Sequence, residues 1–193
     1  GIVGEVYYGQ PVQAMPYRRR LAQLETTALN RLAELHAREP GQLAVMLSFG
    51  ADSLVAYDLS RRAGLDAPAV WVNQGPLAEW PDCLAVKDLM VASGLPLVEI
   101  TPDITLYDWY QQRGIPLNAN MSNTEDEALN KALLYDPLER WQRSVNLRGF
   151  VWGLRWKGEG RHRAFVILKH GEIYTRKADG MTICSPVGNW TKR

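Results

Sequence analysis

Three continuous apolar runs, separated by segments of helical pattern, constrain the fold of this chain more than any other feature of its sequence. The runs are LAVML at 43–47, APAVWVN at 67–73 and LPLVEI at 95–100. Between them, segments 53–63 and 82–93 carry apolar residues at helical spacing, and a glycine follows each segment. Continuous apolar strands that alternate with helices are typical of a parallel sheet covered on both faces. We therefore predict an α/β fold, a parallel sheet flanked by helices.

The rest of the chain adds elements on both sides of this unit. Residues from about 17 to 39 repeat apolar side chains every three or four positions, which predicts an N-terminal surface helix. Beyond Thr101 weaker patterns predict the remaining elements: helices at 107–112 and 125–144, a buried strand at 149–155, and a hairpin at 164–176 that turns at His170-Gly171. Since no linker or repeat interrupts the sequence, we expect a single domain over residues 1–193.

Composition narrows the classes of function. The chain is 46% hydrophobic, its apolar runs are far shorter than the ~20 residues that cross a bilayer, and its first residues lack the pattern of a signal peptide. We therefore expect a cytoplasmic protein without a membrane partner. A net charge of +1 does not predict a nucleic-acid partner. The two cysteines, Cys83 and Cys184, and the three histidines show neither disulfide-framework nor metal-ligand spacing, so we predict no metal site.

The hexapeptide SFGADS, Ser48 to Ser53, lies where the first apolar run turns into a helical pattern. Ligands gather at the carboxyl ends of parallel strands, and N–H groups at the start of the next helix stabilise an anion. Ser48 and Ser53 add hydroxyl donors, while Gly50 leaves room for an oxygen-rich group and lets the main chain approach closely or adopt positive φ. Asp52 is a poor partner for an anion and is expected to cap the helix or organise the turn. An ordinary βα loop capped by Asp52 or Ser53 is the simpler alternative, and local chemistry alone favours it.

A basic segment near the other end of the chain points to the same edge of the sheet. The sequence WGLRWKGEGRHR at 152–163 sets four cations against one acid, Glu159; the cations are Arg155, Lys157, Arg161 and Arg163. Guanidinium groups match phosphate and sulfate oxygens, so a strand that ends near Arg155 would deliver them beside the turn. A solvated basic loop explains this segment equally well when it is taken alone.

Taken in order along the chain, these segments resemble the phosphoadenosine phosphosulfate (PAPS) reductase family, within the adenine nucleotide α-hydrolase-like superfamily that includes the ATP pyrophosphatases. The residues that match the family's motifs are Ser48, Phe49, Gly50, Asp52 and Ser53; Gly75 and Trp80-Pro81, preceded here by Asn73-Gln74; Pro137, Leu138 and Arg140; Gly153, Leu154, Arg155, Glu159 and Arg163; and SPVGNWT at 185–191. Motifs matched in order are far more specific than any one of them.

The resemblance implies an adenine nucleotide α-hydrolase-like fold that binds PAPS, adenylylsulfate or ATP. The nucleotide and phosphate site that it implies consists of Ser48, Phe49, Gly50, Ala51, Asp52, Ser53, Asn73, Gly75, Gly153, Arg155 and Arg163. In the family context the reaction is a thiol-dependent reduction to sulfite, with thioredoxin or glutaredoxin as the partner. Two alternatives stay open. One is an ATP pyrophosphatase that needs Mg²⁺ to neutralise the triphosphate, and the other is a nucleic-acid-binding member of a modification or defence system.

Two departures from the family pattern bear on catalysis. The family's reductases end in a Glu-Cys-Gly-Leu-His segment whose cysteine attacks the sulfonate, and we expect this chain, which stops at Arg193, to end before that segment. The cysteines that hold an iron–sulfur cluster in some members are also missing, so no cluster is expected as a cofactor. Cys83 and Cys184 lie in helical or apolar patterns without the Glu-Cys-Gly context. We therefore predict two packing thiols and assign no catalytic residue.

Overall fold

The computed structural model describes residues 11–75, 77–117, 119–156 and 161–190, with the side chains of 11–16 and 161–164 left aside. Its centre is a six-stranded sheet in the order β3-β2-β1-β4-β6-β5. The strands are β1 (Leu43–Met46), β2 (Ala69–Val72), β3 (Leu97–Ile100), β4 (Gly149–Val151), β5 (Ile173–Thr175) and β6 (Thr182–Cys184). Neighbouring strands pair in parallel except β5 and β6. This confirms the predicted α/β class and adds one antiparallel edge strand.

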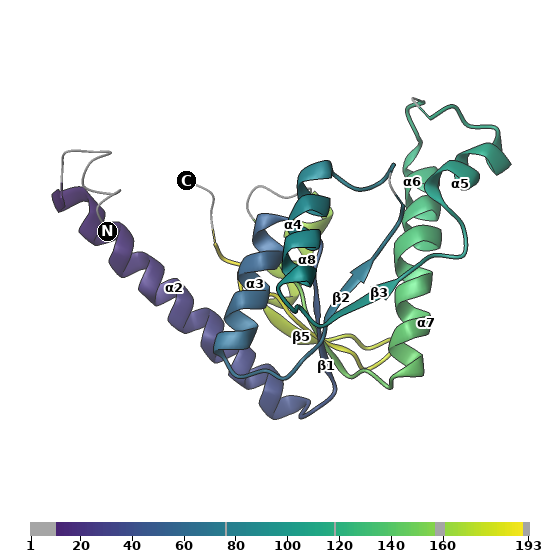
Figure 1. Cartoon of the computed structure of the whole chain (residues 1–193). Coiled ribbons are helices and arrows are strands. Elements are labelled where there is room, and N and C mark those ends of the chain that lie inside the picture. The colour runs from purple at the N-terminus through teal and green to yellow at the C-terminus, as the bar shows by residue number, and fades with distance from the viewer. Residues whose placement is uncertain (1–10, 76, 118, 157–160, 191–193) are drawn as a thin grey trace.

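Helices cover both faces of the sheet (Figure 1). They are α2 (Pro11–Arg38), α3 (Ala51–Arg62), α4 (Pro81–Ala92), α5 (Leu106–Arg113), α6 (Asn123–Asn130), the π-helical turn η1 (Lys131–Tyr135), α7 (Asp136–Ser144) and α8 (Arg161–His170). α2 and α3 pack on one face, against Val45 and Val151, whereas α7 packs on the other, against Ala44 and Phe150. Because successive strand residues point to opposite faces, these strands are buried on both sides, as their continuous apolar runs predict.

The N-terminal helix is longer than predicted. It begins at Pro11 rather than near residue 17 and runs through Pro16, whose missing N–H removes one backbone hydrogen bond. Ala28, Leu32 and Leu35 on its later turns are fully buried. The earlier turns extend past the sheet in Figure 1. Among the described helices, none combines the length and the apolar character needed to cross a membrane.

The helices predicted between residues 53 and 144 are present, with ends shifted by one or two residues. The last of them, at 125–144, is interrupted by η1 directly before Asp136-Pro137. A proline has no N–H for the carbonyl four residues earlier, and its ring crowds that carbonyl. The wider π turn is a common way to accommodate such a disruption inside a helix.

The hairpin predicted at 164–176 is wrong in its first arm. That arm belongs to α8, and only Ile173–Thr175 forms a strand, which pairs antiparallel with β6. Gly171, at φ 81°, donates its N–H to Ile167 O (2.8 Å). The glycine that was expected to turn a hairpin therefore ends a helix instead.

Candidate functional site

The strand order places a topological switch point between β1 and β4. The chain leaves β1 toward β2 on one side, whereas β4 pairs with β1 on the other side and leads on toward β6. Ligands bind at such switch points, outside the carboxyl ends of the strands. The turn 48–53 follows β1 and the segment 152–156 follows β4. Two predicted site segments that are far apart in sequence therefore meet here.

The inner side of the turn after β1 is anchored in the core. Phe49 is buried and meets the ring of Trp71 edge-on, with 5.9 Å between the ring centroids. Phe49 also carries a left-handed φ, 59°, whereas Gly50, which could adopt one, has φ −77°. Ser53 Oγ donates to Gly50 O (2.8 Å) and accepts the N–H of Ser48 (3.2 Å). The hydroxyl of Ser53 therefore closes the turn on itself, and Gly50 does not use the positive φ that a glycine allows.

The outer side of the turn is open. Ser48 and Ala51 are exposed, and among the described atoms a Cβ at Gly50 would meet only Ser48 Oγ, at 3.7 Å. The N–H of Leu54 donates to Gly50 O (3.1 Å), which is the first hydrogen bond of α3. The backbone N–H groups before Leu54 therefore have no carbonyl partner within this helix. Together with the helix dipole, such groups stabilise negative charge at the start of the helix.

Gly153 packs against the start of α3. β4 was predicted to extend to residue 155 but ends at Val151. The chain then passes close beside α3. A Cβ on Gly153 would lie 2.7 Å from Ser53 N and 2.8 Å from Asp52 O. Backbone atoms cannot yield at these distances, so a glycine is required. Gly153 therefore joins the two halves of the predicted site by backbone packing.

Arg155 and Asp52 form an ion pair across the same contact. Arg155 Nη2 lies 2.8 Å from Asp52 Oδ2, and the arginine side chain is 3% exposed against 30% for the aspartate. The expectation that Asp52 caps α3 is wrong, because the N-cap is Gly50 and has no side-chain hydrogen bond. The carboxylate balances a buried arginine instead, since burying a guanidinium without a counter-charge is costly.

Polar groups follow the neighbouring strand β2 as well. Asn73 Nδ2 donates to Glu99 Oε1 (2.7 Å), and Asn73 Oδ1 accepts the N–H of Gly75 (3.0 Å). Gly75 has φ 96°, which favours glycine at this position of the loop. Asn73 thus holds the loop after β2 and fixes a carboxylate on β3. Sequence reasoning missed Glu99, although an acid inside the apolar run 95–100 was a signal.

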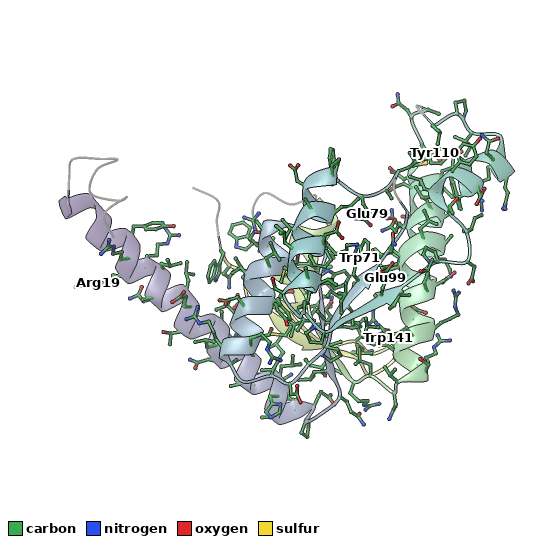
Figure 2. All side chains as sticks on the ribbon, in the orientation of Figure 1. Arg19, Trp71, Glu79, Glu99, Tyr110 and Trp141 are labelled. Carbon is green, nitrogen blue, oxygen red and sulfur yellow. The ribbon has the colours of Figure 1, made fainter. Side chains whose placement is uncertain are left out.

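Glu79 joins this group from the loop before α4. Partial burial raises the pKa of Glu79, although hydrogen bonds from the N–H of Gln74 and the side chain of Trp71 oppose the rise. Trp71 and Glu99 are register partners on β2 and β3. Figure 2 shows Trp71, Glu79 and Glu99 gathered near the carboxyl ends of these strands, between α4 and α6.

The segment after β6 supports the segment after β4. The N–H of Trp152 donates to Cys184 O (2.8 Å), and the N–H of Trp156 donates to Gly188 O (3.0 Å). Gly188, in the predicted motif, therefore contributes backbone support for the Arg155 segment. The side chain of Arg163 and residues 157–160 lie outside the described residues, so the role predicted for Arg163 stays a prediction.

The two cysteines are packing residues, as predicted. Cys184 on β6 is fully buried, and burial raises the pKa of its thiol to about 12, with the nearby charges of Glu172 and Glu34 adding to the rise. Cys83 on α4 is partly buried and packs against the cluster that contains Phe49. A thiol with so high a pKa carries almost no thiolate near neutral pH, so Cys184 does not supply a nucleophile.

The same fold occurs in two enzymes of known structure. A PAPS reductase from Candida auris, solved as a phosphate complex, matches with a TM-score of 0.61 and 15% identity, over 86% of this chain and 74% of the reductase. An FMN adenylyltransferase from Candida glabrata matches with a TM-score of 0.56 and 11% identity, over 88% of this chain. This chain spans about half, 51%, of that enzyme.

No family model and no curated protein sequence matches the chain. At 11–15% identity, the likeness to the two enzymes shows the fold alone. It confirms the predicted α/β fold, a mostly parallel sheet flanked by helices. It leaves the reaction to be argued from the site itself.

Proposed function

We propose that this chain binds an adenine nucleotide at the switch point between β1 and β4, outside the carboxyl ends of these strands. The phosphate or sulfate oxygens lie at the start of α3, against the N–H groups beside Gly50, and the adenosine lies along 72–75. Arg155 borders the same helix start, and Arg163 is the further cation that we assign to the anion. The observation that carries the proposal is the contrast at the turn, whose outer side has room at Gly50 while its inner side is fixed by Phe49 and Ser53.

The solved neighbours support this assignment of ligand class. The Candida auris reductase was solved with phosphate, and the Candida glabrata adenylyltransferase was solved with ATP. Both share the fold that brings the carboxyl ends of β1 and β4 together. An anion at the start of α3 also agrees with the general preference of helix N-termini for phosphate groups.

We propose further that the reaction class is that of a sulfonucleotide reductase acting on PAPS or adenylylsulfate. A thiolate attacks the sulfur, the bond from sulfur to the nucleotide phosphate breaks, and the nucleotide leaves with the electron pair. A second thiol, on a thioredoxin- or glutaredoxin-like partner, then forms a disulfide and releases sulfite. Because neither Cys83 nor Cys184 is placed as a nucleophile, we expect this chain to bind the nucleotide without releasing sulfite when a dithiol is supplied.

A second candidate is an ATP pyrophosphatase that adenylylates another substrate. Asp52 favours it, because this carboxylate stands at the helix start with 30% of its side chain exposed, and carboxylate oxygens are the ligands that Mg²⁺ prefers. Mg²⁺ would neutralise the triphosphate and polarise its phosphoryl oxygens. In this case no thiol is needed, which agrees with the burial of Cys184.

Calorimetry at fixed ionic strength separates these functions. The panel is PAPS, adenosine 3′,5′-bisphosphate, ATP with and without Mg²⁺, and short nucleic-acid duplexes. Preference for the 3′-phosphorylated ligands supports the reductase, whereas Mg²⁺-dependent ATP binding with release of pyrophosphate supports the second candidate. Strongly salt-dependent duplex binding would identify the basic segment 152–163 as a nucleic-acid surface. If no nucleotide binds, the proposal is wrong.

A further inference from the structure

A cavity lies at the amino ends of β4 and β6, at the opposite end of the strands from the proposed nucleotide site. The C-terminal end of α7, the turn 146–148 before β4 and the β5–β6 turn enclose about 320 Å³. Figure 1 shows the end of α7 at the lower edge of the view, where β1 begins, away from the turn at 48–53. Ligand pockets begin at about 300 Å³, so this volume suits a small molecule.

Gln142 is a polar residue at a core-facing position of α7. Leu134 and Leu138, at helical spacing before it, pack on the sheet in one hydrophobic cluster. Gln142 continues the stripe and is 6% exposed, yet it lines the cavity. In the described part of the chain its carboxamide makes no hydrogen bond, although its backbone carbonyl accepts from Leu147 N–H (2.9 Å). The amide is not buried without access to a partner, because it lines the cavity and can donate to a group bound there.

The charges around the cavity favour an anion. Asp179 accepts hydrogen bonds from Arg176 and from the N–H of Met181, and Glu139 lies 3.4 Å from Arg143. Both lining carboxylates therefore already have cationic partners. Arg148 forms a looser ion pair, because its Nε lies 3.9 Å from Glu39 Oε2, which is beyond hydrogen-bond distance. The Oε1 atom of Glu39 accepts from the Thr182 hydroxyl (2.9 Å).

We propose that this cavity binds a small organic carboxylate. The guanidinium of Arg148 pairs with the carboxylate, because its planar fork matches two oxygens, and the Gln142 amide donates to the same group. Leu147, Ala178 and Met181 line the cavity and offer an apolar wall for a short carbon chain. Because the cavity lies at the amino ends of the strands and the nucleotide site lies at their carboxyl ends, such a ligand binds without displacing a nucleotide. The proposal is independent of the proposed function.

Titration of the ¹⁵N-labelled chain with propionate, succinate and propionamide tests this site. We expect saturable shifts at the backbone amides of Leu147, Arg148 and Met181 with a Kd of about 1 mM or tighter for a carboxylate. Propionamide, which has the same size without the charge, should bind at least tenfold more weakly. The absence of saturable shifts at these amides, or equal binding of propionamide, would overturn the proposal.

Two variants and one control locate the binding. Gln142→Leu and Arg148→Gln should each weaken carboxylate binding at least tenfold, whereas Gln112→Leu, on the exposed surface of α5, should leave it unchanged. If Gln142→Leu does not fold, carboxylate binding by Arg148→Gln alone tests the site. Binding that survives Arg148→Gln contradicts the assignment.

Discussion

Gly50 and Gly153 lie on opposite sides of one helix start, and they differ in the room around them. A side chain at Gly50 would enter open space, whereas a side chain at Gly153 would strike the backbone of Asp52 and Ser53. The two glycines match the same family pattern in the sequence, yet one leaves room for a ligand and the other fixes two chain segments together. The candidate site therefore has an open outer side and a closed inner side, and these respond differently to substitution.

The largest effect is expected at Gly153. Gly153→Ala places a Cβ at 2.7 Å from Ser53 N, so the start of α3 or the segment after β4 must move. We expect a loss of about 3 kcal/mol in the free energy of unfolding, at the upper end for overpacking. The matched control, Gly50→Ala, should cost less than about 1 kcal/mol. Urea denaturation of both variants measures the difference, and equal costs would contradict the contrast between the two sides.

The ion pair between Asp52 and Arg155 links the two sides. Asp52→Asn leaves the buried guanidinium beside a neutral amide, and we expect it to lower the free energy of unfolding by about 2 kcal/mol, less than for a fully buried pair because Asp52 is partly exposed. The same variant should bind a nucleotide anion more tightly, since it removes a negative charge from the helix start. Urea denaturation and calorimetry measure the two effects.

Arg155→Lys is the companion variant. It should weaken nucleotide binding, because a single ammonium cannot replace the fork that holds Asp52 beside the start of α3. If Asp52→Asn and Arg155→Lys change nucleotide affinity in the same direction, the pair does not border the ligand in the way that we propose.

Gly50→Val tests the open side directly. The branched side chain would occupy the space in front of the α3 N–H groups, and we expect nucleotide affinity to fall at least tenfold, or about 1.4 kcal/mol. The fold should survive, because the nearest described atom to a Cβ here is Ser48 Oγ at 3.7 Å. Ala92→Val, at the exposed end of α4, is the control in the same calorimetric assay. Unchanged affinity in a folded Gly50→Val variant would place the ligand elsewhere.

The difference between the two halves of the chain explains how far the fold could be predicted. From β1 to β3, each strand is an apolar run and each helix ends near a glycine, so local pattern and tertiary structure agree. At 164–168 the apolar run suits a strand or a helix equally well. Its packing decided the outcome, since Ile167 lies against the segment at Gly188, a contact that the sequence does not reveal.

The sequence predicted which segments form the candidate site, but not which of their side chains pair with each other. The ordered motifs located the turn 48–53 and the segment at Gly153 and Arg155, because each follows a strand. The pairing of Asp52 with Arg155 depends on β1 and β4 being neighbours in the sheet, and no local pattern gives that order. Glu99 was missed for the same reason, since its partner Asn73 follows a different strand, β2.

The smallest effect concerns Cys184, on the closed side, whose carbonyl accepts the N–H of Trp152. Burial raises the pKa of this thiol to about 12 in the folded chain, whereas an exposed cysteine titrates near about 8.5. The stability from the neutral thiol is complete below the unfolded pKa and is lost as the pH rises toward the folded pKa. Between about pH 8 and about pH 9.5, the native chain should lose about 1 kcal/mol more stability than Cys184→Ala. Urea denaturation at both pH values measures this difference, which cancels the titration of lysines and tyrosines common to both proteins. Equal losses would mean that the thiol ionises in the folded chain and that water reaches the closed side of the site.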